Sequence, residues 1–108
     1  MYYPNSKNWM RIKAKPRVLM LFSANWCTPC ISVKDQIMTL EKDPKYAAVD
    51  FVYVDIEDCP ELFQYFSVQS TPTLIALRSG APRGALMGSV TKPKIESILG
   101  FLLKERKK

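Results

Sequence analysis

A Trp-Cys-Thr-Pro-Cys sequence at residues 26–30 restricts what this chain can fold into more than any other segment. It follows a short apolar run at residues 18–22, which is typical of a buried parallel strand, and it opens a helix predicted over residues 28–42. Cys27 therefore lies at a helix N-terminus, where unpaired N–H groups and the helix dipole stabilise a thiolate. Cys30 follows one turn later on nearly the same face, so the two sulfurs can form and break a disulfide with little backbone movement.

An isolated Cys-x-x-Cys pair has two other interpretations, a zinc site and a structural disulfide. The chain has three Cys and no His, so Cys59 alone cannot complete a usual zinc site, and a carboxylate would have to be the fourth ligand. One pair and one odd Cys also do not match the dense, even pattern of small secreted scaffolds. The absence of His excludes Ser-His-Asp and Cys-His catalytic pairs and haem attachment. We therefore expect a redox pair in a cytoplasmic protein that holds no metal.

Length and composition indicate a single domain covering residues 1–108. Apolar residues make up 47% and charged residues 24% of the chain, which is typical of a globular protein. No apolar run approaches the roughly 18–20 residues that a membrane helix needs, and the first residues do not form a signal-peptide pattern. The net charge of +6 includes a basic tail at residues 104–108, but no nucleic-acid-binding motif accompanies it. We expect neither nucleic acid nor a membrane among its partners.

Periodicity and turn residues predict an α/β fold with a central mixed sheet of four to five strands and helices on both faces. The last two strands are joined by a short Gly/Pro loop, which requires an antiparallel hairpin. A very short strand at Met1 to Tyr3 would be the fifth. The other predicted elements are a helix at 6–13, strands at 17–23, 50–56, 73–78 and 84–88, a short helix at 59–66 and a final helix capped by Thr91.

The Cys motif and a Thr-Pro-Thr segment at residues 71–73 together resemble the thioredoxin family. The proline lies 45 residues after Cys27 and just before a predicted strand, which is similar to the placing of the family's cis-proline opposite its Cys pair. The resemblance covers residues 17–103, and residues 1–16 form an N-terminal segment truncated relative to full-length members. It implies a thioredoxin-like fold with a cis bond before Pro72.

Three later residues extend the resemblance toward the C-terminus. Gly80 is similar to the family's hairpin-turn glycine, and Gly88 is similar to the glycine beside its substrate groove. Thr91 and the amphipathic segment behind it resemble the family's last helix.

The resemblance implies that the protein reduces protein disulfides. The Cys27 thiolate would attack a substrate disulfide, and Cys30 would resolve the mixed disulfide, leaving the redox-active Cys27–Cys30 disulfide. The protein would be a monomer without a cofactor of its own, reduced by a thioredoxin reductase and acting on disulfide-containing proteins. The residues implied to contact the substrate are Trp26, Thr28, Pro29, Thr71, Pro72 and Gly88.

The sequence departs from the family pattern beneath the active site. Leu21 stands where the family usually buries an acid, and the Lys that pairs with this acid would fall near Val52 or Tyr53, so it is absent too. Without the acid, we expect Cys30 to lose its proton less readily and resolution of the mixed disulfide to be slow. Three further differences from the family lie at Ser23, Thr28 and Asp35.

Two questions stay open at this point. Cys59 fits a half-buried local thiol, with Glu57 and Asp58 opposing its ionisation, but an extra Cys in a comparable setting of animal family members is linked to regulation or dimerisation. The chain could also be an extracytoplasmic disulfide oxidase or isomerase, or a thioredoxin-like module that binds partners without using its thiols. A measured reduction potential and a variant with Ser at both Cys positions would separate these alternatives.

Overall fold

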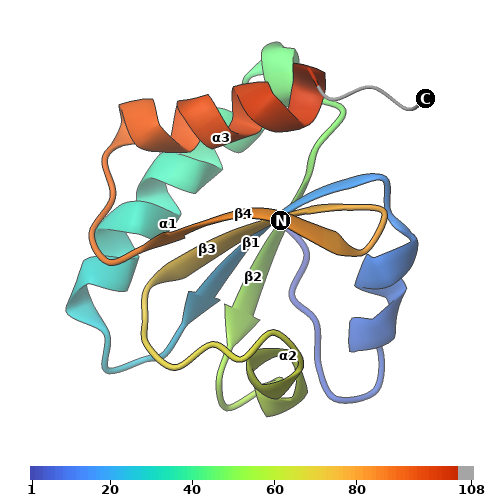
Figure 1. Cartoon of the computed structure of the whole chain (residues 1–108). Coiled ribbons are helices and arrows are strands. Elements are labelled where there is room, and N and C mark those ends of the chain that lie inside the picture. The colour runs from blue at the N-terminus through green and yellow to red at the C-terminus, as the bar shows by residue number, and fades with distance from the viewer. Residues whose placement is uncertain (105–108) are drawn as a thin grey trace.

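The computed structural model describes residues 1–104, and residues 105–108 of the predicted basic tail lie outside the described residues. Its elements in chain order are η1 (Trp9–Ala14, a 3₁₀ helix), β1 (Arg17–Ser23), α1 (Thr28–Glu41), η2 (Pro44–Tyr46, a 3₁₀ helix), β2 (Asp50–Asp55), α2 (Pro60–Tyr65), β3 (Thr73–Arg78), β4 (Ala81–Met87) and α3 (Lys92–Lys104). The strands form one sheet in the order β2-β1-β3-β4 (Figure 1). β1 is parallel to β2 and antiparallel to β3, and β3 pairs antiparallel with β4. The predicted α/β fold with a mixed sheet is confirmed.

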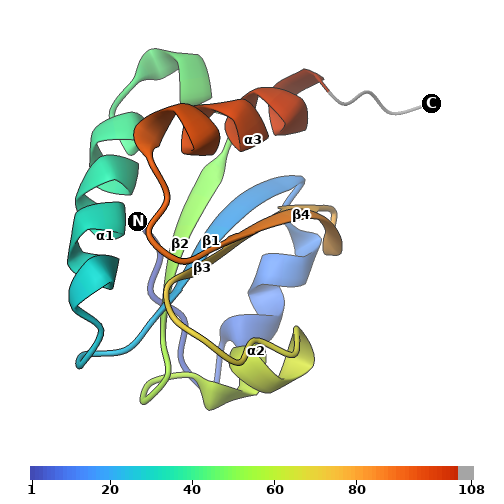
Figure 2. The same ribbon diagram turned by 60° about the vertical axis from the view of Figure 1, so that its left-hand side comes forward.

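Helices cover both faces of the sheet. α1 and α3 lie on one face, while α2 and η1 lie on the other (Figures 1 and 2). The central strand β1 is buried on both faces, as its unbroken apolar run predicts. Leu19 and Leu21 belong to the core cluster that includes residues of α1 and α3, whereas Met20 and Phe22 belong to the one that includes residues of α2. β1 thus joins two cores and ends between them, where the Cys motif begins.

The N-terminal segment differs from the prediction in two ways. The predicted helix at 6–13 begins only at Trp9, because the Asn5 side chain accepts the N–H groups of Lys7 and Asn8 at 2.8 and 3.1 Å and forms a turn there. The predicted strand at Met1 to Tyr3 is reduced to one isolated parallel bridge between Tyr2 and Val52. The sheet therefore has four strands.

The β3–β4 hairpin is tighter than predicted. Ser79 and Gly80 both have positive φ, 51° and 85°, which is the backbone of a two-residue hairpin turn. β4 therefore starts at Ala81 and not at residue 84. Pro82 is tolerated inside this strand because β4 is at the sheet edge, and the pairing with β3 shifts register between Ala76 and Leu77. In residues 1–104, no helix is long and apolar enough to cross a membrane.

Candidate active site

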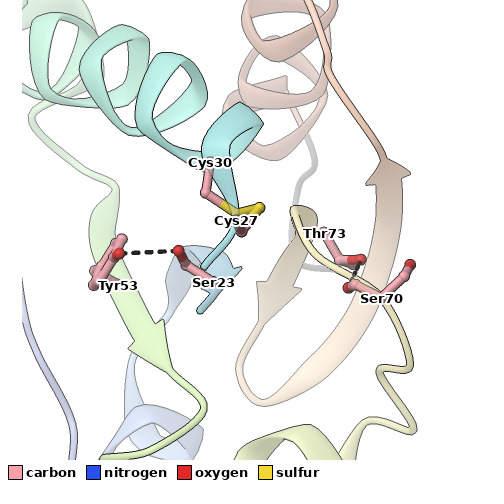
Figure 3. The surroundings of a disulfide bond; sticks show 6 residues. All are labelled: Ser23, Cys27, Cys30, Tyr53, Ser70 and Thr73. Carbon is pink, nitrogen blue, oxygen red and sulfur yellow. Dashed lines mark hydrogen bonds between the residues drawn. A yellow bond between two sulfur atoms is a disulfide. The ribbon is translucent and has the colours of Figure 1, made fainter. Parts of the chain in front are cut away.

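The two cysteines of the motif lie where the C-terminal end of β1 meets the start of α1. Cys27 is the residue before the helix, with extended backbone (φ −92°, ψ 97°), and Pro29 occupies the first turn without loss of a helical hydrogen bond. The Cys27 N–H donates to the Ala24 carbonyl at 3.0 Å. Cys27 and Cys30 form a disulfide with their Cα atoms 5.4 Å apart (Figure 3). The predicted ability of the pair to bond across one helical turn is confirmed.

The two cysteines differ in the fraction of their surface that is exposed. Cys27 is 8% exposed and Cys30 is 2% exposed, so both are mostly covered and Cys27 is the outer one. Trp26 beside them is 67% exposed, an unusual position for so large an apolar side chain. Thr28 and Pro29 are also exposed. An incoming sulfur atom therefore meets an apolar rim around Cys27 before it meets Cys30.

The Thr71–Pro72 peptide bond is cis, which confirms the prediction made from the Thr-Pro-Thr segment. Gly88, with φ 84°, donates its N–H to the Pro72 carbonyl at 2.9 Å and so fixes the end of β4 against this loop. Thr73 begins β3, and its Oγ1 donates to the Ser70 carbonyl at 2.8 Å; Figure 3 shows both residues on the side of the disulfide away from Tyr53.

The predicted contact residues fall into two groups. Trp26 and Thr71 line one pocket of about 230 Å³, so the structure brings together the motif and the loop before β3. Gly88 and Pro72 do not line that pocket; Gly88 is hydrogen-bonded to Pro72, the residue after Thr71.

A second cavity, of about 320 Å³, lies on the other side of the disulfide. Its polar and sulfur-bearing lining includes Ser23, Cys27, Cys30, Lys34, Asp35 and Tyr53. The Tyr53 hydroxyl donates to Ser23 Oγ at 2.9 Å (Figure 3), and the Lys34 ammonium lies 4.3 Å from the centre of the Tyr53 ring. This side of the site carries hydroxyl, ammonium and carboxylate groups beside apolar side chains such as Ile31 and Met38, and its acid, Asp35, is exposed.

The strand register explains which residue occupies the place of the absent Lys. Leu21 is fully buried and is the Cα partner of Tyr53 in the parallel β1–β2 pair, and both contribute to the same core cluster. Val52 belongs to the cluster on the opposite face. Of the two positions named from the sequence, Tyr53 is therefore the one that faces the site.

Sequence reasoning missed the contributions of Tyr53 and Lys34. The signal was present in part, because Ser23 is a departure from the family and Tyr53 is one of the two positions near which the absent Lys would fall, but their contact depends on the register of two strands. Lys34 could have been found from its spacing, since it lies four residues after Cys30 and therefore on a neighbouring part of the same helix face.

Cys59 is a free thiol that is fully buried, not half-buried as predicted. Burial raises the pKa of the Cys59 thiol; the backbone N–H of Leu62 opposes this shift, and the charge of Glu61 adds to it. The acid that acts on the thiol is therefore Glu61, not Glu57 or Asp58. Among residues 1–104, no group of three or more Cys, Asp and Glu side chains is arranged to hold a metal ion.

Comparison with known proteins identifies the family. The thioredoxin family model matches residues 3–100. The chain is 30% identical over 97 residues to the chloroplastic M-type thioredoxin of Triticum aestivum, covering 88% of this chain and 55% of that protein. It is 33% identical over 86 residues to the thioredoxin of Sus scrofa, covering 80% of this chain and 79% of that protein. The chain thus spans about half the length of the wheat relative and most of the pig one.

The fold agrees with solved structures. A mutant thioredoxin from Halobacterium salinarum superposes with a TM-score of 0.84 at 18% identity, covering 98% of this chain and 93% of that one. The match of the family model to most of the chain, the shared fold, and the Cys27–Cys30 pair at the junction of β1 and α1 lead to one conclusion. The chain belongs to the thioredoxin family.

Proposed function

We propose that this protein reduces disulfide bonds in other proteins by dithiol–disulfide exchange. The observation that carries the proposal is the disulfide between Cys27 and Cys30 at the start of α1, with Cys27 as its more exposed residue. A thiolate is the attacking species in such exchange, and a helix N-terminus favours it. The roles follow from access: Cys27 attacks and Cys30 resolves.

Two exchange steps complete the reaction. The Cys27 thiolate attacks one sulfur of the substrate disulfide, and the other substrate sulfur leaves as a thiolate that takes up a proton. The Cys30 thiolate then attacks Cys27 Sγ, the bond between Cys27 and the substrate breaks, and the second substrate sulfur leaves reduced. The substrate gains two electrons, and the Cys27–Cys30 pair loses them.

The substrate surface in this proposal consists of the exposed rim and the loop before β3. The pocket shared by Trp26 and Thr71 would hold side chains that flank the substrate cysteine. Thr71 lies just before β3 and outside the strand pairs of the sheet, so its backbone could pair with an extended substrate segment. Thr28, Pro29, Pro72 and Gly88 complete the proposed contact surface.

The electron donor, location and assembly state belong to the same proposal. A thioredoxin reductase would return electrons to the Cys27–Cys30 disulfide, so the chain needs no cofactor of its own. The protein would act as a monomer in the cytoplasm, where thiols are kept reduced.

Insulin reduction and a reduction potential test the proposal together. With NADPH and a thioredoxin reductase, the protein should reduce insulin catalytically, and its potential should lie near the roughly −270 mV of thioredoxin. A potential near the roughly −120 mV of a disulfide oxidant, with no insulin reduction, would contradict the proposal. A physiological partner that binds equally well when both Cys27 and Cys30 are replaced by Ser would indicate a binding module.

A further inference from the structure

The hydroxyl groups of Ser23 and Tyr53 lie at the cavity beside the disulfide and have no role in the two exchange steps. Ser23 is fully buried at the end of β1, and Tyr53 reaches it from β2. Both residues line the cavity that Cys30 also lines, and Figure 3 shows them on the side of the disulfide away from Thr73. Ser23 is fully buried and Tyr53 is half-buried, and their mutual hydrogen bond places two hydroxyl groups at the cavity that the two cysteines line.

The hydrogen bond uses only part of the capacity of the pair. The Tyr53 and Ser23 hydroxyl oxygens lie 2.9 Å apart, and whichever hydroxyl donates, the other keeps its hydrogen and both keep a lone pair for a further partner in the cavity. The Lys34 ammonium lies over the Tyr53 ring, at 4.3 Å from its centre, which restrains Tyr53 and places a positive charge beside the cavity. A hydroxyl donor and a cation near a sulfur both favour its thiolate form.

The cavity can also hold water. Its volume of about 320 Å³ is large enough for several molecules, and it offers hydroxyl, ammonium and carboxylate partners. The side chain of Leu21, in contrast, is fully buried and offers no polar atom.

We infer that the Ser23–Tyr53 hydroxyl pair positions the water that accepts the proton of Cys30 when the mixed disulfide is resolved. The inference rests on the proposed function. The Cys30 thiol passes its proton to that water, and the resulting thiolate attacks Cys27 Sγ. The new bond joins Cys27 and Cys30, and the bond from Cys27 to the substrate breaks. The substrate sulfur leaves with the electron pair and takes up a proton from solvent, so protons and electrons balance.

The other titratable groups around this cavity are few. α1 contributes Lys34 and Asp35, and the motif contributes Cys27. The N-terminal segment contributes Tyr3, whose ring lies 5.6 Å from that of Tyr53. Asp35 is the rival proton acceptor because it is an exposed carboxylate at the same cavity.

Single-turnover kinetics with a fluorescent disulfide peptide separate attack from resolution. We expect Tyr53→Phe and Ser23→Ala each to slow peptide release about 10-fold near pH 7, less than the loss of a direct proton acceptor would give. Formation of the mixed disulfide should stay within about twofold of wild type. The defect should shrink toward pH 9, where hydroxide ionises Cys30 without help. Tyr3→Phe removes a hydroxyl from the same aromatic cluster and is the matched control, which should behave as wild type.

The outcomes are distinct. Unchanged release in Tyr53→Phe and Ser23→Ala, or a defect of equal size from pH 6 to 9, overturns the inference, since a purely structural effect would not depend on pH. A defect that appears in Asp35→Asn but not in Tyr53→Phe assigns the proton to the carboxylate and also overturns it. If one variant fails to fold, the other decides. A wild-type protein that never forms the mixed disulfide would instead refute the proposed function.

Discussion

Cys27 and Cys59 occupy the same local position in two different helices. Each is the residue before a helix, and each helix has a Pro in its first turn. Yet Cys27 is partly accessible and bonded to Cys30, whereas Cys59 is fully buried and free.

The third residue after each Cys and the surroundings explain the difference. Cys27 is followed three residues later by Cys30, and Cys59 by the core residue Leu62. Burial raises the pKa of the Cys59 thiol despite its place at a helix start. A position before a helix is therefore not enough to make a cysteine a nucleophile. The cysteine also needs access to solvent and a second cysteine one turn later.

The largest expected effect is on insulin reduction when Cys27 or Cys59 is replaced by Ser. With NADPH and a thioredoxin reductase, Cys27→Ser should lower insulin reduction about 10³-fold or more, to the rate measured without the protein, because it removes the attacking atom. Cys59→Ser is the matched control, and its turnover per folded molecule should equal that of wild type. Turnover retained in Cys27→Ser would show that another thiol attacks.

An acid introduced at Leu21 tests how strongly the buried surroundings control the site. Leu21→Asp should lower the free energy of unfolding by about 2–5 kcal/mol, because the carboxyl is buried without a cation opposite it. Burial would raise the pKa of this carboxyl, so the folded state holds its proton to higher pH and stability falls as pH rises from about 4 to 8. Urea unfolding at several pH values measures this slope; a flat profile would show that the carboxyl reaches solvent.

In the folded fraction of Leu21→Asp, resolution of the mixed disulfide should be faster near pH 7. In the molecules where the introduced carboxyl is ionised near pH 7, it would assist Cys30 directly, because a carboxylate accepts a proton better than water does. The single-turnover release rate is the measurement. A rate equal to or below that of wild type across pH 6 to 9 would mean that proton removal does not limit resolution.

A second cysteine three residues after Cys59 tests whether the Cys-x-x-Cys spacing alone is enough for disulfide reduction. Leu62→Cys creates the Cys-x-x-Cys spacing at α2, but both sulfurs would lie in the core, since Leu62 is fully buried. In a Cys27→Ser background we expect no insulin reduction, and a loss of about 1–3 kcal/mol in stability from the removed side-chain volume. Restored insulin reduction would show that spacing outweighs access.

The smallest expected effect is on the pH dependence of the free energy of unfolding, which tests the burial of the Cys59 thiol. Its raised pKa means that the folded state keeps the thiol proton longer than the unfolded state, so stability falls as pH rises above the ordinary thiol pKa of about 9. The loss should stay below about 1.4 kcal/mol per pH unit and vanish in Cys59→Ser. Because the thiol is buried, neither protein should form a disulfide-linked dimer under oxidising conditions. A dimer that forms only in wild type would support a regulatory role for Cys59.

The sequence predicted those parts of the site that depend on neighbouring residues. The Cys pair at a helix start follows from a short segment with strong local preferences. The cis bond before Pro72 was predicted from the resemblance of the Thr-Pro-Thr segment to the family, because the local preference of an X-Pro bond is trans. The Ser23–Tyr53 contact could not be predicted in this way, because it needs the β1–β2 register, in which Tyr53 lies opposite Leu21.

Two errors in the fold have a similar physical origin. β4 extends through Pro82, which strand propensity opposes but an edge position allows. The N-terminal helix begins late because Asn5 forms its own side-chain turn. Each outcome depends on a contact or a position in the sheet that hydrophobic periodicity does not encode.

Competitive alkylation tests most directly the claim that access and surroundings, not a helix start alone, make Cys27 the nucleophile. The fully reduced protein is treated near pH 7 with less than one equivalent of iodoacetamide, and the modified cysteine is identified by mass spectrometry. We predict modification at Cys27 at least about 10-fold faster than at Cys59, because the partly accessible Cys27 at the helix start reacts as a thiolate and the fully buried Cys59 thiol does not. Modification of Cys59 as fast as Cys27 in the folded protein would contradict the account.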